Sequence, residues 1–121
     1  MYEYKARVVK VIDGDTLDLE IDLGFHVKHE LRLRLNHLDA PEMRFEAGRK
    51  AKEYVISWLT TCPWENGVAL VTVKTDRDKT EKYGRYLGVV YAYGPVAEGL
   101  PSLNDALLAS GNAQPYEGGA R

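Results

Sequence analysis

The sequence predicts an α+β fold in the order three strands, a helix, two strands and a second helix. Five short segments are rich in β-branched or alternating apolar residues, which is typical of strands with one buried face. Residues 46–61 instead repeat their apolar positions at helical spacing. A run of strands with one inserted helix argues against βαβ winding, in which strands and helices alternate.

Turn residues keep the first three expected strands together. Leu17, Leu19 and Ile21 alternate with acidic residues, so the second strand has the clearest amphipathic pattern. An Asp-Gly pair precedes this strand and Gly24 ends it, which predicts a three-stranded meander. The five strands are expected at residues 3–12, 17–23, 27–36, 68–74 and 86–93.

The two helices complete the predicted architecture. The first is expected over residues 46–61, and the second begins at Ser102, where an acid three residues later gives capping-box spacing. Gly111 suits the position after the second helix, and the polar tail 112–121 is expected to be flexible. A five-stranded barrel with a helix between strands three and four is the Greek-key OB-type arrangement, here expected as one domain over residues 1–121.

The charge balance limits how this chain could bind a polyanion. The net charge is -2 and the pI is about 5.9, whereas proteins that bind nucleic acid by bulk charge are basic. Attraction must therefore come from a local patch or a bound metal. No apolar run approaches the roughly 18 residues of a membrane span, and no apolar signal region follows Met1. We expect the protein to have no membrane partner and to be a monomer. A cytoplasmic or phage-encoded protein is one possibility compatible with this sequence.

The first cluster with possible chemistry is Asp13-Gly14-Asp15-Thr16. Asp-Gly between two strands is a strong hairpin signal, so a plain turn is one interpretation. A calcium loop of the EF-hand type is excluded, because the Gly and Glu that it requires at its sixth and twelfth positions are missing. The functional interpretation is that Asp15 donates a hard oxygen ligand to a divalent cation.

The second cluster follows the third strand. Arg32 and Arg34 share the face opposite three leucines, and the alternation then gives way to Asp39-Ala40-Pro41-Glu42. One interpretation is a helix start, with Asp39 as N-cap, a proline in the first turn and an acid three residues on. The functional interpretation gives Asp39 to a metal and leaves Glu42 free to act on water.

The third cluster is Lys82-Tyr83-Gly84-Arg85. It is either a solvated turn into the fifth strand or a basic loop that clamps a phosphate through paired hydrogen bonds from Arg85. Taken together, two acidic clusters suit a hard cation, two separated arginines suit a phosphodiester that gains charge on attack, and one spare carboxylate suits water activation. This combination favours metal-assisted phosphoryl hydrolysis.

The three motifs resemble those of the staphylococcal nuclease (thermonuclease) family of calcium-dependent nucleases. The shared pattern is Val-Ile-Asp-Gly-Asp-Thr at 11–16, Arg34 five residues before Asp39-Ala40-Pro41-Glu42, and Glu81-Lys82-Tyr83-Gly84-Arg85, all in the family's order. The resemblance covers roughly residues 6–113. It implies a five-stranded OB barrel with packed helices, and hydrolysis of single-stranded DNA or RNA that leaves 3′-phosphate ends.

The same resemblance implies a calcium site. Asp15 and Asp39 would be calcium ligands, and Ala40 would add its backbone carbonyl. Thr16 would help to place a metal-bound water.

The resemblance also assigns the groups that meet the substrate. Glu42 would orient or deprotonate the attacking water. Arg34 and Arg85 would bind the scissile phosphate and stabilise the transition state. Lys82 and Tyr83 would contact a neighbouring phosphate.

The chain departs from the family pattern in three places. The connection between Glu42 and the first helix is shorter than in the best-known members, and the family's C-terminal third helix is not expected here. Members with two base-stacking tyrosines carry them after the second helix, where this chain has Tyr116 alone. Stacking is worth about 1 to 3 kcal/mol per base, so the departure affects substrate affinity and base preference.

Two other functions compete with a nuclease. A non-catalytic OB domain that binds nucleic acid or protein would share the fold, although such copies usually lose site residues. A structural calcium-binding domain would explain the acids but not the two arginines. The three histidines, His26, His29 and His37, are expected to be ordinary strand or surface residues rather than zinc ligands.

Overall fold

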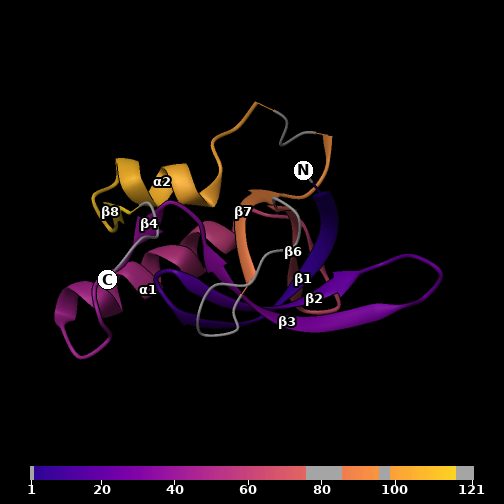
Figure 1. Ribbon diagram of the computed structural model, residues 1–121, viewed down its shortest axis with the longest axis horizontal. Helices are drawn as coiled ribbons and strands as arrows, with labels where there is room; N and C mark the ends of the chain where they lie inside the picture. The colour runs from indigo at the N-terminus through magenta and orange to yellow at the C-terminus, as the bar shows by residue number, and fades with distance from the viewer. Residues whose placement is uncertain (1, 76–85, 96–98, 117–121) are drawn as a thin grey trace.

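The computed structural model describes residues 2–75, 86–95 and 99–116, and the predicted OB-type α+β architecture is confirmed within them (Figure 1). Five strands form a closed barrel with two helices packed against it. The barrel strands are β1 (Tyr2–Asp13), β2 (Thr16–Asp22), β3 (Lys28–Leu35), β6 (Val68–Thr75) and β7 (Tyr86–Ala92). The helices are α1 (Glu46–Leu59) and α2 (Leu103–Ala109).

Pairing between β1 and β6 closes the barrel. The strand order is β1-β2-β3-β7-β6, and the 12-residue β1 pairs with β6 through its first half and with β2 through its second half. Register shifts after Val8 and Val11 let β1 bend between its two partners. The β3–β7 pairing is parallel and the others are antiparallel, so the barrel is mixed. Closure covers the strand edges that an open sheet would leave exposed.

Alternation along the strands fills the barrel. The predicted apolar face of β2 is buried, with Leu17 and Leu19 fully inaccessible to solvent. Helix α1 adds Val55 and Leu59 to the same core, which joins both helices to the strands. The remaining fully buried members include Leu33, Leu35, Val71, Val73, Val90, Leu103 and Leu107. No helix in the described part of the chain is long and apolar enough to cross a membrane.

The ends of α2 match their predicted caps. The Ser102 side chain accepts a hydrogen bond from the Asp105 backbone N–H at 3.0 Å. Gly111 has φ +79°, and the N–H groups of Gly111 and Asn112 donate to the carbonyls of Leu108 and Leu107. This is the Schellman arrangement that glycine favours after a helix.

Three short strands were not anticipated: β4 (Leu38–Asp39), β5 (Trp64–Glu65) and β8 (Gln114–Pro115). Strand β4 pairs with β8, so part of the expected flexible tail is held beside the end of β3. The helix-start interpretation of Asp39 is wrong, because Asp39 lies in β4 and α1 begins at Glu46. Pairings of two residues are too short to show a periodicity in sequence.

A buried amide side chain locks α2 to the turn after β3. The Oδ1 of Asn104 accepts from the Val90 N–H at 3.1 Å. Its Nδ2 donates to the carbonyls of Asn36 at 3.0 Å and Gly88 at 3.2 Å. Because Asn104 is 5% exposed, water cannot replace these bonds without a local opening of the structure.

We predict that Asn104→Ala lowers the free energy of unfolding by about 2 to 3 kcal/mol, because it leaves buried backbone groups unpaired. Urea denaturation measures this loss. Asn112→Ala is the matched control, since the Asn112 side chain donates to the exposed Ser110 hydroxyl and to no other group in the described part of the chain. Its expected cost is below about 0.5 kcal/mol. Equal losses in the two variants would contradict the role of Asn104.

Candidate active site

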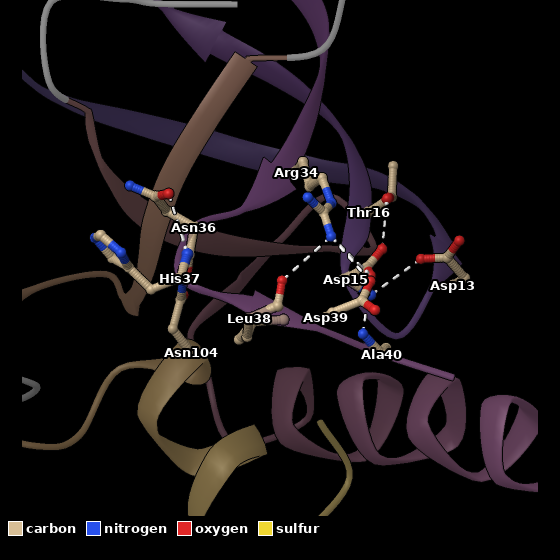
Figure 2. A network of polar contacts seen from close by, with 10 residues as sticks. All are labelled: Asp13, Asp15, Thr16, Arg34, Asn36, His37, Leu38, Asp39, Ala40 and Asn104. Carbon is tan, nitrogen blue, oxygen red and sulfur yellow. Dashed lines mark hydrogen bonds and ion pairs between the residues drawn. The ribbon is translucent and has the colours of Figure 1, made fainter. Parts of the chain in front are cut away.

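Acidic and basic side chains meet where the β1–β2 turn, the end of β3 and β4 come together (Figure 2). Asp15 lies in the turn and is 7% exposed, and Arg34 near the end of β3 is 8% exposed. They are neighbours because β2 pairs with β3 in a register that sets Thr16 opposite Arg34. Asp39 follows from β4, five residues after Arg34.

The Asp15 carboxylate ties three segments together. Its Oδ1 accepts a hydrogen bond from the Thr16 hydroxyl at 2.9 Å, and its Oδ2 accepts from the Ala40 N–H at 3.0 Å. Its backbone carbonyl accepts from the Leu35 N–H at 2.8 Å. The turn is therefore held both to β3 and to the segment after β4.

One guanidinium nitrogen lies between the two acids. Nη2 of Arg34 donates to Asp39 Oδ1 at 3.0 Å and to the Leu38 carbonyl at 3.3 Å, and lies 3.7 Å from Asp15 Oδ2. The two carboxylates that the sequence predicted as a pair are thus within contact distance of a single atom. Their charges are partly compensated by the same cation in this arrangement.

The C-terminal strand brings an aromatic ring to the same place. The Tyr116 N–H donates to the His37 carbonyl at 2.9 Å, just after the β8 pairing with β4. The Arg34 Cζ atom lies 5.2 Å from the centre of the Tyr116 ring, a cation–π distance. Tyr116 is therefore adjacent to Arg34 although 82 positions separate them in sequence.

The two acids of the turn differ in their protonation. Burial and, to a smaller extent, the adjacent Asp15 carboxylate together raise the pKa of Asp13 to about 6. Burial also acts to raise the pKa of Asp15, but hydrogen bonds from Asp13, Ala40 and Thr16 outweigh it, and the net effect is a pKa below the usual value. Asp15 consequently stays negative when Asp13 takes up a proton.

The donor chemistry fits a hard divalent cation in part. Asp15 and Asp39 offer carboxylate oxygens at one point, and hard cations such as calcium take six to eight oxygen ligands. Within the described ranges, no group of three or more His, Cys, Asp or Glu side chains is arranged to hold an ion. Backbone carbonyls and water would have to complete the coordination.

Of the other predicted site residues, Glu42 pairs with a neighbouring arginine and three lie outside the described residues. The Glu42 side chain is 67% exposed, and its carboxylate pairs with Arg44 Nε at 2.6 Å. It thus points to a neighbour that the sequence did not suggest. Lys82, Tyr83 and Arg85 fall outside the described residues.

Small residues let α1 approach the site closely, and the sequence interpretation missed them. A Cβ built on Gly14 would lie 2.7 Å from the Ala51 Cβ of α1 and 2.8 Å from the Ala40 Cβ. A Cβ on Gly48 of α1 would overlap the Glu42 carbonyl oxygen. Helix α1 therefore packs on the turn that carries Asp15 and on the segment that follows Asp39. The signal for this contact in the sequence was the pair of small residues Gly48 and Ala51, three positions apart in the expected helix.

We predict that Gly14→Ala lowers the free energy of unfolding by about 1 to 3 kcal/mol, because the new methyl group overpacks this contact. Ala51→Gly alone should cost about 1 kcal/mol through helix propensity. In the double variant, Ala51→Gly removes one of the two clashes, so the loss should be smaller than the sum of the single losses. Denaturant titration of all four proteins gives the coupling, and strict additivity would contradict the predicted contact.

Several known proteins with similar sequences carry nuclease names. No family model matches the chain. It is 32% identical over 117 residues to "Protein ParB" of Escherichia coli, and 30% identical over 117 residues to "Micrococcal nuclease" of Shigella flexneri. It is 33% identical over 112 residues to an "Uncharacterized endonuclease" of Escherichia coli O157:H7. These matches cover 93 to 94% of this chain but only 58 to 61% of the relatives, so the chain spans about three fifths of their length.

Proposed function

This chain belongs with the staphylococcal nuclease-like proteins, and on that premise we propose that it hydrolyses phosphodiester bonds of DNA or RNA. The observation that carries the proposal is the placement of Arg34 between Asp15 and Asp39. Phosphodiester hydrolysis needs positive charge where the phosphoryl oxygens gain negative charge, and oxygen ligands for a cation. Both occur within one cluster of contacts.

Calcium is the proposed cofactor. Asp15 and Asp39 would hold it, with the Ala40 carbonyl as a further ligand and Thr16 acting through a water. The lowered pKa of Asp15 supports this assignment, because the ionised carboxylate is the form that binds a cation. Bound calcium would polarise a phosphoryl oxygen of the substrate.

Two arginines are proposed to bind the scissile phosphate. Arg34 carries a planar guanidinium that matches the geometry of phosphate oxygens, and Arg85 would act with it. The Tyr116 ring beside Arg34 offers a surface on which a base next to that phosphate could stack. Lys82 and Tyr83 would contact a neighbouring phosphate.

Glu42 is proposed to orient or deprotonate the attacking water. Its exposure leaves it accessible to solvent, but its carboxylate pairs with Arg44 in the described arrangement. An exposed ion pair is worth at most about 1 kcal/mol, so it is no obstacle to a turn of Glu42 toward water. Attack by this water would release the 5′ oxygen and leave 3′-phosphate ends, and single strands are the proposed substrate.

A non-catalytic OB domain that binds nucleic acid or protein is the alternative. Incubation of the chain with labelled single-stranded DNA and RNA, with calcium or with a chelator, separates the two. Calcium-dependent fragments with 3′-phosphate ends would support the nuclease. Binding without cleavage under both conditions would favour the alternative.

Arg34→Ala is expected to lower the rate of calcium-dependent cleavage about 10²- to 10³-fold, the cost of removing one donor from a developing anion. Arg32→Ala is the matched control on the same strand, because Arg32 pairs with Asp18 and not with the site acids. Its cleavage rate should stay close to that of the parent chain. The rates are measured on a labelled oligonucleotide.

Arg34→Lys distinguishes a loss of catalysis from a loss of folding. It keeps a cation beside Asp15 and Asp39 but loses the planar fork, so it should fold and still cleave poorly. Parental cleavage by both Arg34 variants would overturn the assignment of Arg34 to the phosphate.

Glu42→Gln is expected to lower kcat about 10²- to 10⁴-fold while leaving substrate binding nearly unchanged, as for loss of a general base. Arg44→Ala should not lower kcat, because it only frees the Glu42 carboxylate from its ion pair. Steady-state kinetics on the same oligonucleotide measure both. An equal fall in kcat for the two variants would show that the ion pair itself, rather than the free carboxylate, is needed.

A further inference from the structure

A second group of basic and aromatic residues lies on the outer face of β1, β6 and β7, which pair side by side (Figure 1). The inward residues Val71, Val73 and Val90 are buried, so their strand neighbours point outward. In the register, Lys5 of β1 is opposite Thr72 of β6, which is opposite Tyr91 of β7. We call Lys5, Lys74, Tyr91 and Tyr93 the lysine–tyrosine face.

Each of the two lysines of this face lies over a tyrosine ring, and Glu3 is the acid opposite Lys74 in the β1–β6 register. Lys5 Nζ lies 5.0 Å from the centre of the Tyr93 ring, and Lys74 Nζ lies 4.8 Å from that of Tyr91. Elsewhere Arg7, Arg32 and Arg34 all form ion pairs with carboxylates. Among the described residues no ion pair joins Lys5 or Lys74 to an acid, so the positive charge of this face is not neutralised by a direct contact.

A groove runs beside three of these side chains, those of Lys74, Tyr91 and Tyr93. It has a volume of about 300 Å³ and is lined by Lys74, Tyr91 and Tyr93 on the sheet side and by Leu100 on the other. Leu100 is 58% exposed. Glu3 also borders the groove and is the acid that opposes an anionic ligand there. The combination of aromatic rings, an apolar wall and cations suits a flat ring that carries a phosphate.

The plain interpretation is a solvated sheet face on which lysine stems cover tyrosine rings. The charge balance favours a ligand instead. The chain has net charge -2, so a polyanion needs local cations, and here two cations that form no ion pair within the described part of the chain lie over two rings. Strand β7 also connects the face to the site, because Leu87 pairs with Arg34 and Tyr91 follows four residues later, about 13 Å along the strand.

We propose that the lysine–tyrosine face binds a single strand of nucleic acid, with phosphates at Lys5 and Lys74 and bases on Tyr91 and Tyr93. Aromatic side chains and cations in a groove are the usual means of sequence-tolerant single-strand binding. The inference rests on the proposed function, because it places this face as a second contact for a substrate that also reaches Arg34. It predicts that long substrates bind better than short ones.

The test measures the anisotropy of a fluorescent single-stranded oligonucleotide in chelator, where no cleavage is expected. Tyr91→Leu/Tyr93→Leu should raise Kd at least about tenfold, since stacking on two rings is lost while apolar bulk remains. Lys5→Gln/Lys74→Gln should raise Kd and reduce the slope of log affinity against log salt by about 1.4, because two phosphates are no longer neutralised by the protein. Glu3→Gln should lower Kd.

Lys28→Gln/Lys52→Gln is the control, because it removes the same charge from other parts of the surface. If the face variants match this control in Kd and salt slope, or if the parent does not bind the oligonucleotide, the inference is overturned. Cleavage of a dinucleotide with calcium tests the proposed function separately, since so short a substrate cannot reach both places. A parent that binds but never cleaves refutes the nuclease and leaves the binding face intact.

Discussion

The contact on which the site depends is the hydrogen bond from the Ala40 N–H to the Asp15 carboxylate. It joins a turn near the start of the chain to the segment after β4, and the same carboxylate lies 3.7 Å from Arg34 Nη2. Asp15 is largely withdrawn from water, and an unpaired charge in such a buried position would be costly. The surrounding donors hold its pKa low, so the acid stays ionised inside the fold.

Barrel closure and helix packing both serve this contact. The β2–β3 register sets Thr16 beside Arg34, and β4 contains Asp39 and leads directly to Ala40. Helix α1 can pack closely on the turn because Gly14 and Ala51 are small, and this contact leaves no room for a larger side chain at Gly14. Replacing a small residue here would move the acids relative to the guanidinium, so the packing of α1 is part of the site geometry.

Sequence periodicity revealed the barrel strands, and two acidic motifs pointed to Asp15 and Asp39, but neither revealed what depends on placement in space. Leu17 and Leu19 could be assigned to the core because alternation follows from strand geometry. The β4–β8 pairing could not, because two residues have no period. Likewise, Tyr116 reaches Arg34 only through that pairing, and the Glu42–Arg44 ion pair depends on local side-chain rotamers.

The negative net charge gives a reason for placing the residues that attract a nucleic acid apart from the residues of the metal site. Acids that hold a cation repel a polyanion until the cation is bound, and Arg34 is already shared between two of them. Additional cations placed next to Asp15 and Asp39 would compete with a metal for the same oxygens. Positive charge that attracts a strand without this competition has to lie elsewhere on the barrel. The lysines over Tyr91 and Tyr93 satisfy that condition, because they contact tyrosine rings rather than Asp15 or Asp39, and Tyr91 lies on β7, the strand that pairs with Arg34.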